Sequence, residues 1–89
     1  MSTKIRASKW EKVDWVEVGR RIRELRGFDL TQQQFATHIG ISQNYLSYME
    51  RGKVEIGAEI LLRIGRVFGK TIEWLLTGQE AGSSDRSGL

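Results

Sequence analysis

A stretch near the middle of the chain, TQQQFATHIGISQNYLSYMERGK, most constrains the fold, because it encodes two short helices that meet at a tight corner. Thr31 is a good N-cap, and Gln34 follows it three residues later, which is the spacing of a capping box. Gly40 ends the first helix, since glycine enters the left-handed C-cap conformation without steric cost. Ser42 then caps the second helix almost at once. Residues 31–53 are therefore predicted to form a helix pair.

The second helix of this pair divides into two faces on a wheel of about 100° per residue. Its outward arc carries amide, hydroxyl, phenol and guanidinium groups and no carboxylate. Such groups hydrogen-bond to base edges and phosphates, which favours a helix that reads the major groove of DNA. Solubility alone also requires a polar outer face, so both interpretations stay open. The outward residues are Gln43, Asn44, Ser47, Tyr48 and Arg51, and the inward ones are Tyr45, Leu46 and Met49.

The composition predicts one small domain that is held together by packing. The chain has 89 residues, no cysteine and one histidine, so neither a disulfide framework nor a metal site is expected. No Ser/His/Asp set and no glycine-rich phosphate loop is present, so no catalytic residue and no cofactor are expected. Proline is absent and helical periodicity dominates, which predicts an all-α fold. No apolar run reaches the roughly 18 residues of a membrane span, so a cytoplasmic protein is expected.

The ends of the chain differ from its middle. The net charge of +3 lies at the N-terminus, where residues 1–12 have basic residues and no apolar period. This predicts a basic flexible arm, either a solubilising tail or a segment that binds phosphates or a minor groove. Trp10 is unusual in such an arm, and its role stays open. Residues 13–78 form the predicted domain, and residues 79–89, small and polar, are predicted to be a disordered tail.

Three further helices are predicted from apolar residues at helical spacing. The first begins at a cap on Asp14 and ends near Arg26, after which Phe28 and Leu30 are expected to carry the chain inward. The other two follow a loop at residues 54–57. The expected apolar residues are Val18, Ile22 and Leu25 in the first helix, Ile60, Leu61, Ile64, Val67 and Phe68 in the fourth, and Ile72, Trp74, Leu75 and Leu76 in the fifth.

Four segments together, RRIRELR, LTQQQFA, GISQNYLSYMERG and IEWLLTG, resemble the Cro/repressor-type helix-turn-helix family, also called the Xre family. The resemblance covers about residues 15–78. It implies a compact five-helix bundle of the lambda-repressor-like kind, in which the second and third helices bind DNA. It also implies that bases are read by Gln43, Asn44, Ser47 and Tyr48, and that phosphates are bound by Gln32, Gln33, Arg51 and Lys53.

The same resemblance implies contacts within and between subunits. Arg26 and Glu50 match a structural ion pair between the first and third helices. Trp74 and Leu75 match a dimer interface, although they could instead close the core of the monomer. Because one such helix pair reads only a few base pairs, a homodimer on a near-palindromic operator is expected.

Two departures from the family pattern concern the fourth helix. Gly57 stands where a capping side chain is usual, which weakens the start of the helix. Gly65 replaces a usual alanine and costs about 1 kcal/mol, unless close packing requires a glycine there.

These features predict a sequence-specific regulator of transcription that binds double-stranded DNA. The resemblance implies repression as the expected action of a small domain in which no activation surface is evident. An enzyme is not expected, and neither a membrane nor a small-molecule effector is expected as a partner. The alternative is an antitoxin or accessory module that uses the same fold to bind a protein partner.

Overall fold

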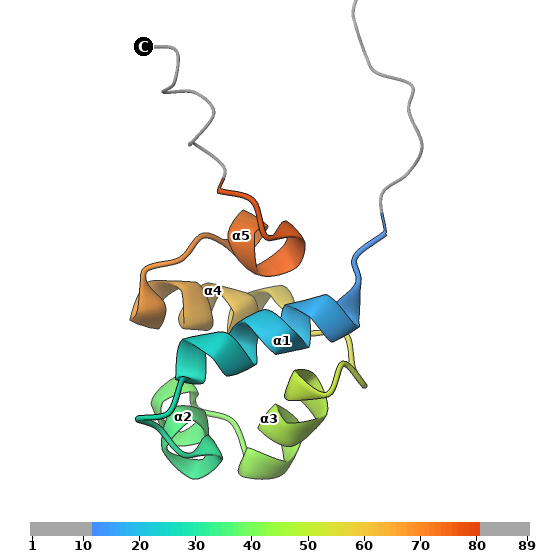
Figure 1. The fold of residues 1–89 in the computed structure, drawn as a ribbon. Helices are drawn as coiled ribbons and strands as arrows, with labels where there is room; N and C mark the ends of the chain where they lie inside the picture. Colours follow the sequence, from blue (N-terminus) through green and yellow to red (C-terminus); the bar gives the residue numbers. More distant parts are fainter. Residues whose placement is uncertain (1–11, 81–89) are drawn as a thin grey trace, which may run out of the picture.

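The computed structural model describes residues 12–80, which fold into five α-helices without a strand in that range (Figure 1). The all-α class predicted from the sequence is therefore confirmed. Trp10, the predicted arm up to residue 11 and the predicted tail from residue 81 lie outside the described residues. The helices are α1 (Trp15–Arg26), α2 (Gln32–Ile39), α3 (Gln43–Glu50), α4 (Ala58–Phe68) and α5 (Ile72–Thr77).

The helices are arranged so that α2 and α3 occupy one end of the domain and α5 the other (Figure 1). Between these ends lie α1 and α4, and α1 packs against both α3 and α5. None of the helices within residues 12–80 is long and apolar enough to cross a membrane.

Side-chain caps set the starts of the helices much as the sequence predicts. The Thr31 capping box is complete: its hydroxyl accepts from the Gln34 amide at 3.1 Å, and the Gln34 side chain accepts from the Thr31 amide at 2.9 Å. Ser42 accepts from the Tyr45 amide at 3.0 Å and so caps α3. Between the two helices Gly40 has a φ of 83°, the left-handed conformation that the corner requires.

One cluster of buried side chains joins all five helices. The ring of Phe35 in this cluster stacks on the ring of Phe68, which packs against the cluster, with centroids 5.0 Å apart, and this contact links α2 to α4. Such offset aromatic pairs stabilise beyond the area that they bury. The buried members are Val18, Ile22, Phe35, Ala36, Ile39, Leu46, Met49, Ile56, Leu61, Ile64 and Leu75.

Two predicted inward residues are in fact exposed, and the sequence interpretation is wrong for both. Phe28 is fully exposed, because the turn after α1 swings outward at Gly27, whose φ is 64°. Only Leu30 turns back toward the core. Val67 is 51% exposed, because it lies about 100° around α4 from Phe68, at the edge of the buried stripe.

The two glycines of α4 behave differently. Gly57 forms the N-cap without any side-chain hydrogen bond, as expected from the missing capping residue. Gly65 meets the condition under which a glycine is required: a methyl group there would lie 2.5 Å from the carbonyl oxygen of Lys70. The turn between α4 and α5 therefore packs directly on the backbone of α4.

Candidate nucleic-acid interface

The outward face of α3 presents polar side chains to solvent. Gln43, Asn44 and Tyr48 are exposed and Ser47 is half-buried, whereas Leu46 and Met49 on the opposite face are fully buried. The helix thus has an inner side fixed in the core and an outer side that carries amide and hydroxyl groups. This is the division that a helix needs to enter a groove of DNA.

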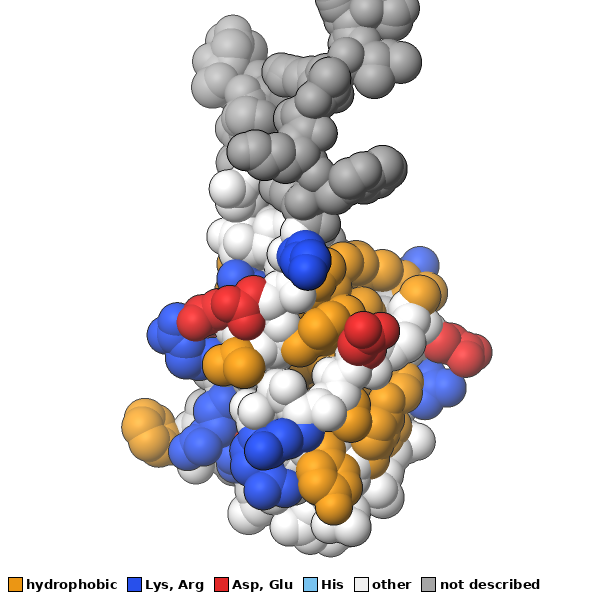
Figure 2. Space-filling view, turned by 90° about the vertical axis from the view of Figure 1, so that its right-hand side faces the viewer, with side chains coloured by type: hydrophobic (Ala, Val, Ile, Leu, Met, Phe, Trp, Pro, Cys, Tyr) orange, Lys and Arg blue, Asp and Glu red, His pale blue; other side chains and the backbone are white. Residues whose placement is uncertain are grey.

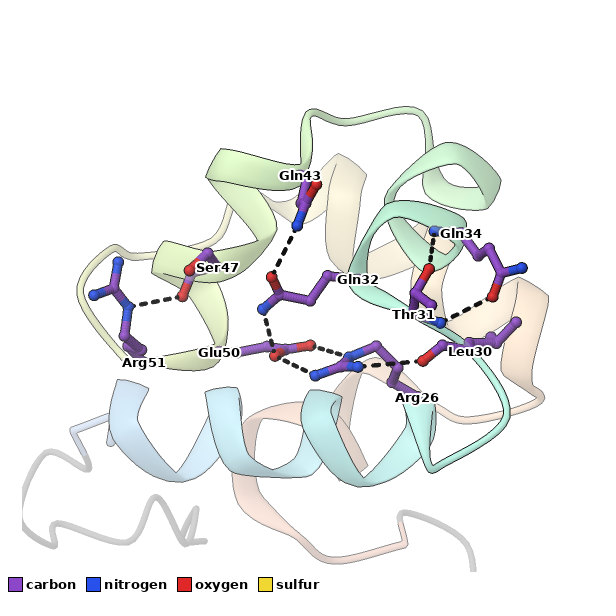
Figure 3. Close-up of polar contacts among 9 residues, drawn as sticks. All are labelled: Arg26, Leu30, Thr31, Gln32, Gln34, Gln43, Ser47, Glu50 and Arg51. Carbon is purple, nitrogen blue, oxygen red and sulfur yellow. Dashed lines mark hydrogen bonds and ion pairs between the residues drawn. The ribbon is translucent and has the colours of Figure 1, made fainter.

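Arg26 and Glu50, expected to pair, form a two-pronged ion pair between α1 and α3 (Figure 3). The Arg26 Nε donates to one carboxylate oxygen at 2.8 Å and its Nη2 donates to the other at 3.0 Å. The side chains are only 12% and 5% exposed, respectively. Hydrogen bonding to Glu50 raises the pKa of Arg26 above its ordinary value, so the guanidinium stays charged.

A chain of hydrogen bonds runs from this ion pair to the outer face of α3. The side-chain amide of Gln32 donates to Glu50 at 3.0 Å, and the amide of Gln43 donates to the oxygen of Gln32 at 3.4 Å (Figure 3). Gln32 therefore links the start of α2 to both ends of α3. Gln43 consequently keeps its own amide oxygen and one N–H for another partner.

The other residues predicted to bind phosphates lie in the first turn of α2 and just after α3. Gln33 is exposed in the first turn of α2, and Lys53 is exposed in the loop after α3. Arg51 donates to the backbone oxygen of Ser47 at 3.3 Å, and its guanidinium lies 5.2 Å from the centre of the Tyr48 ring. On the face shown in Figure 2, the lower part, at the end of the domain where α3 lies, displays Lys and Arg side chains but no Asp or Glu.

Two glycines that sequence reasoning did not single out hold α1 against the end of α3. A methyl group on Gly19 would lie 2.3 Å from the carbonyl oxygen of Met49. One on Gly52 would lie 2.6 Å from the α-carbon of Val16, and Gly52 also has a φ of 71°. The signal for Gly19 is a glycine in the middle of a strongly patterned helix, where it is otherwise unfavourable.

The two residues predicted to form a dimer interface, Trp74 and Leu75, differ in burial. Leu75 is fully buried in the core of the monomer, so the prediction that it contacts a second subunit is wrong. Trp74 is half-buried, and the Lys70 ammonium lies 4.6 Å from the centre of its ring. Leu75 faces inward because α1 and α4 both pack on α5.

Comparison with known proteins identifies the family. A helix-turn-helix family model matches residues 20–75, which contain the α2–α3 corner and most of the other helices. The chain belongs to the Cro/C1-type helix-turn-helix family. The motif resemblance seen in the sequence is therefore confirmed, and so is the lambda-repressor-like fold.

Similar sequences in this family are named as regulators of transcription. The HTH-type transcriptional activator BcrR of Enterococcus faecalis is 35% identical over 79 residues, which is 83% of this chain and 39% of that protein. This chain thus spans about two fifths of the length of BcrR. An uncharacterised HTH-type transcriptional regulator of Archaeoglobus fulgidus is 33% identical over 54 residues, 60% of this chain and 76% of that protein.

Solved structures of other Cro/C1-type regulators share the fold. The restriction-modification controller protein C.AhdI of Aeromonas hydrophila has a TM-score of 0.63 and 28% identity, covering 70% of this chain and 96% of its own. The P22 c2 repressor, solved with a synthetic operator, has a TM-score of 0.65 and 28% identity over the same shares. Within residues 12–80 of this Cro/C1-type domain, no group of His, Cys, Asp or Glu is placed to hold a metal ion.

Proposed function

We propose that this chain is a sequence-specific, double-stranded DNA-binding regulator of transcription that places α3 in the major groove. The observation that carries the proposal is the carboxylate-free outer face of α3, which the nearly buried Arg26–Glu50 pair anchors to α1. Membership of the Cro/C1-type family and the names of its relatives support the same function. Anchoring matters because base reading requires a helix at a fixed angle in the groove.

Base reading is assigned to the first two turns of α3. The exposed amides of Gln43 and Asn44 suit adenine, because an amide oxygen can accept from the N6 amino group while the amide N–H donates to N7. Ser47 and Tyr48, one turn later, reach the next base or its methyl group. Phosphates are assigned to Gln33, Arg51 and Lys53 and to the free backbone N–H groups at the start of α2. Gln32 is also assigned to a phosphate, which it contacts through the side-chain N–H that does not donate to Glu50.

We infer that the regulator acts as a homodimer on a near-palindromic operator, because a single α3 contacts too few base pairs for specificity. The contact between subunits is assigned to the α5 end of the domain, which lies opposite α2 and α3 (Figure 1). Trp74 is the residue proposed there, together with its half-buried neighbours Ile72 and Leu76. Two α3 helices about 34 Å apart would then enter successive turns of one groove.

Repression is the proposed action, since a bound dimer can block a promoter by occupancy without any further contact. The similar proteins include both an activator of transcription, BcrR, and a repressor, P22 c2. A promoter fused to a reporter, with the operator placed over or upstream of the polymerase site, measures the sign directly. Reduced expression from the overlapping operator is expected, and increased expression would assign activation instead.

The experiment that tests DNA reading is selection of bound duplexes from a random pool at about 0.15 M salt, near physiological ionic strength. We expect an enriched near-palindrome with half-site centres about 10 base pairs apart. Binding that is salt-sensitive but blind to sequence would contradict the assignment of α3. In that case a protein partner, as for an antitoxin or accessory module, becomes the better interpretation.

Two variants separate base contacts from phosphate contacts on the selected operator. Gln43→Ala should lose about 1–3 kcal/mol of discrimination at one or two base pairs. Lys53→Ala should weaken all duplexes about equally and reduce the slope of log K against log salt by about one. Unchanged sequence preference in Gln43→Ala would show that this residue does not read a base.

A further inference from the structure

The corner between α2 and α3 is hydrogen-bonded to a side chain of α4. Two backbone amides at the corner donate to one carbonyl oxygen earlier in α2. The Gly40 amide donates to the Ala36 carbonyl oxygen at 2.8 Å, and the Ile41 amide donates to it at 3.0 Å. The carbonyl oxygen of Ile39, the last residue of α2, instead accepts from the Nη1 of Arg63 at 3.0 Å. Arg63 lies in the middle of α4, 24 residues further along the chain.

The Arg63 guanidinium lies directly on the corner. Its Nη1 is 3.3 Å from the position that a methyl group on Gly40 would occupy. The cation also lies at the C-terminal end of α2, where the helix dipole is negative and carbonyl groups lack partners within the helix. A single side chain from α4 thus holds both the end of α2 and the backbone that leads into α3.

The two ends of α3 are fixed in different ways. Its C-terminal end is held by the Arg26–Glu50 pair and by the close contact of Gly19 with the Met49 carbonyl. Its N-terminal end, which carries Gln43, follows the corner by only three residues. The angle of α3 about its fixed end therefore depends on where the corner sits.

We propose that Arg63 is a positioning residue for DNA reading, which fixes the α2–α3 corner so that the first turn of α3 meets the bases. This inference rests on the proposed function. Arg63 itself need not touch DNA. Direct base readout depends on hydrogen-bond geometry, whereas sequence-blind binding depends on the sum of phosphate charges. Loss of the Arg63 contact should therefore lower specific binding more than non-specific binding.

The test compares Arg63→Met with Arg66→Met. Both variants remove one positive charge from α4, and Arg66 is exposed without a hydrogen-bond or ion-pair partner within residues 12–80. Dissociation constants are measured for the selected operator and for a scrambled duplex at one salt concentration, at a temperature where circular dichroism shows each variant to be folded. The quantity compared is the ratio of specific to non-specific affinity.

We expect Arg63→Met to lower that ratio about tenfold, which corresponds to the loss of one base contact when the first turn of α3 is misplaced. Arg66→Met should leave the ratio unchanged while weakening both duplexes slightly. Equal losses on both duplexes in the two variants would overturn the proposal, because Arg63 would then act only through its charge.

A second measurement needs neither a variant nor DNA. In the wild-type protein, the side-chain N–H groups of Arg63 should exchange with solvent more slowly than those of Arg66, as followed by NMR. Equal exchange would show that the Arg63 contact does not persist in solution, which overturns the proposal even if Arg63→Met fails to fold. If the wild type shows no sequence preference while Arg63 is protected, the proposed function fails and the contact itself remains.

Discussion

Gly19 of α1 lies directly against the carbonyl oxygen of Met49 in α3, so that a methyl group on Gly19 would stand 2.3 Å from that oxygen. Because the neighbouring atoms are backbone, they cannot give way by a change of rotamer. Gly19→Ala should therefore destabilise the domain by at least the 1–3 kcal/mol that is typical of overpacking, despite the better helix propensity of alanine. Denaturant unfolding measures this change.

Glu24→Ala provides the control for that variant, since Glu24 is exposed on the same helix. It should change the free energy of unfolding by less than about 0.5 kcal/mol. A Gly19→Ala variant as stable as the wild type would contradict the close α1–α3 contact.

The buried ion pair gives a second prediction. Glu50→Gln leaves the charge of Arg26 nearly buried without a counter-ion, and loss of one partner of such a pair costs about 3–5 kcal/mol. Arg26→Met should cost a similar amount, because it strands the carboxylate. The double variant should be more stable than the sum of the single losses predicts. Additive losses in thermal and denaturant unfolding would show that the two side chains do not interact in solution.

Gln32 links the ion pair to the outer face of α3, and its removal should affect recognition more than stability. Gln32→Ala deletes the acceptor for the Gln43 amide and one donor to Glu50. We expect weaker discrimination at the base pair assigned to Gln43, together with a stability loss of about 1–2 kcal/mol. Competition binding with single-base operator variants measures the first effect.

Gln33→Ala is the matched control for Gln32→Ala, because Gln33 is exposed and makes no hydrogen bond within residues 12–80. It should weaken all operators alike. If Gln32→Ala also weakens them alike, the Gln32–Gln43 contact plays no part in base reading.

The start of α4 offers a stabilising substitution. Gly57 is the N-cap with a φ of −67°, a conformation open to any residue, and no atom lies within 4 Å of the position of an added methyl group. Gly57→Ser supplies the missing cap and restricts the unfolded chain, so a gain of about 0.5–1 kcal/mol is expected. An increase in Tm of several degrees would agree with this, and a decrease would show that the cap geometry differs.

Local signals made much of this fold predictable. The caps at Thr31 and Ser42 and the glycine at position 40 each act within a few residues, so the sequence alone locates the corner. Helical spacing also identified Leu46 and Met49 as the inner side of α3. The partner of Glu50 could be named only through the family resemblance, since the two residues of that pair lie 24 positions apart.

Features that depend on how helices meet could not be predicted in the same way. Periodicity gives the direction of an apolar stripe but not its width, so it predicts Val67 to be inside, whereas Val67 is exposed. The dimer contact of Leu75 was implied by the family resemblance, which does not show how much of α5 the other helices bury. The close contacts of Gly19 and Gly52 involve backbone atoms of another element, so the sequence can mark Gly19 as unusual in a helix but cannot show what it contacts. The contact of Arg63 with the end of α2 is equally non-local.

The division of α3 into two sides has a consequence for how such a protein can diverge. The side chains that hold the helix in place, Leu46, Met49 and Glu50, are distinct from those that face outward, Gln43, Asn44 and Ser47. Substitutions on the outward side remove no buried contact of the core and so carry little penalty in folding. Paralogues of this domain could therefore acquire new binding sites in few mutational steps, with thermal stability largely retained along the way.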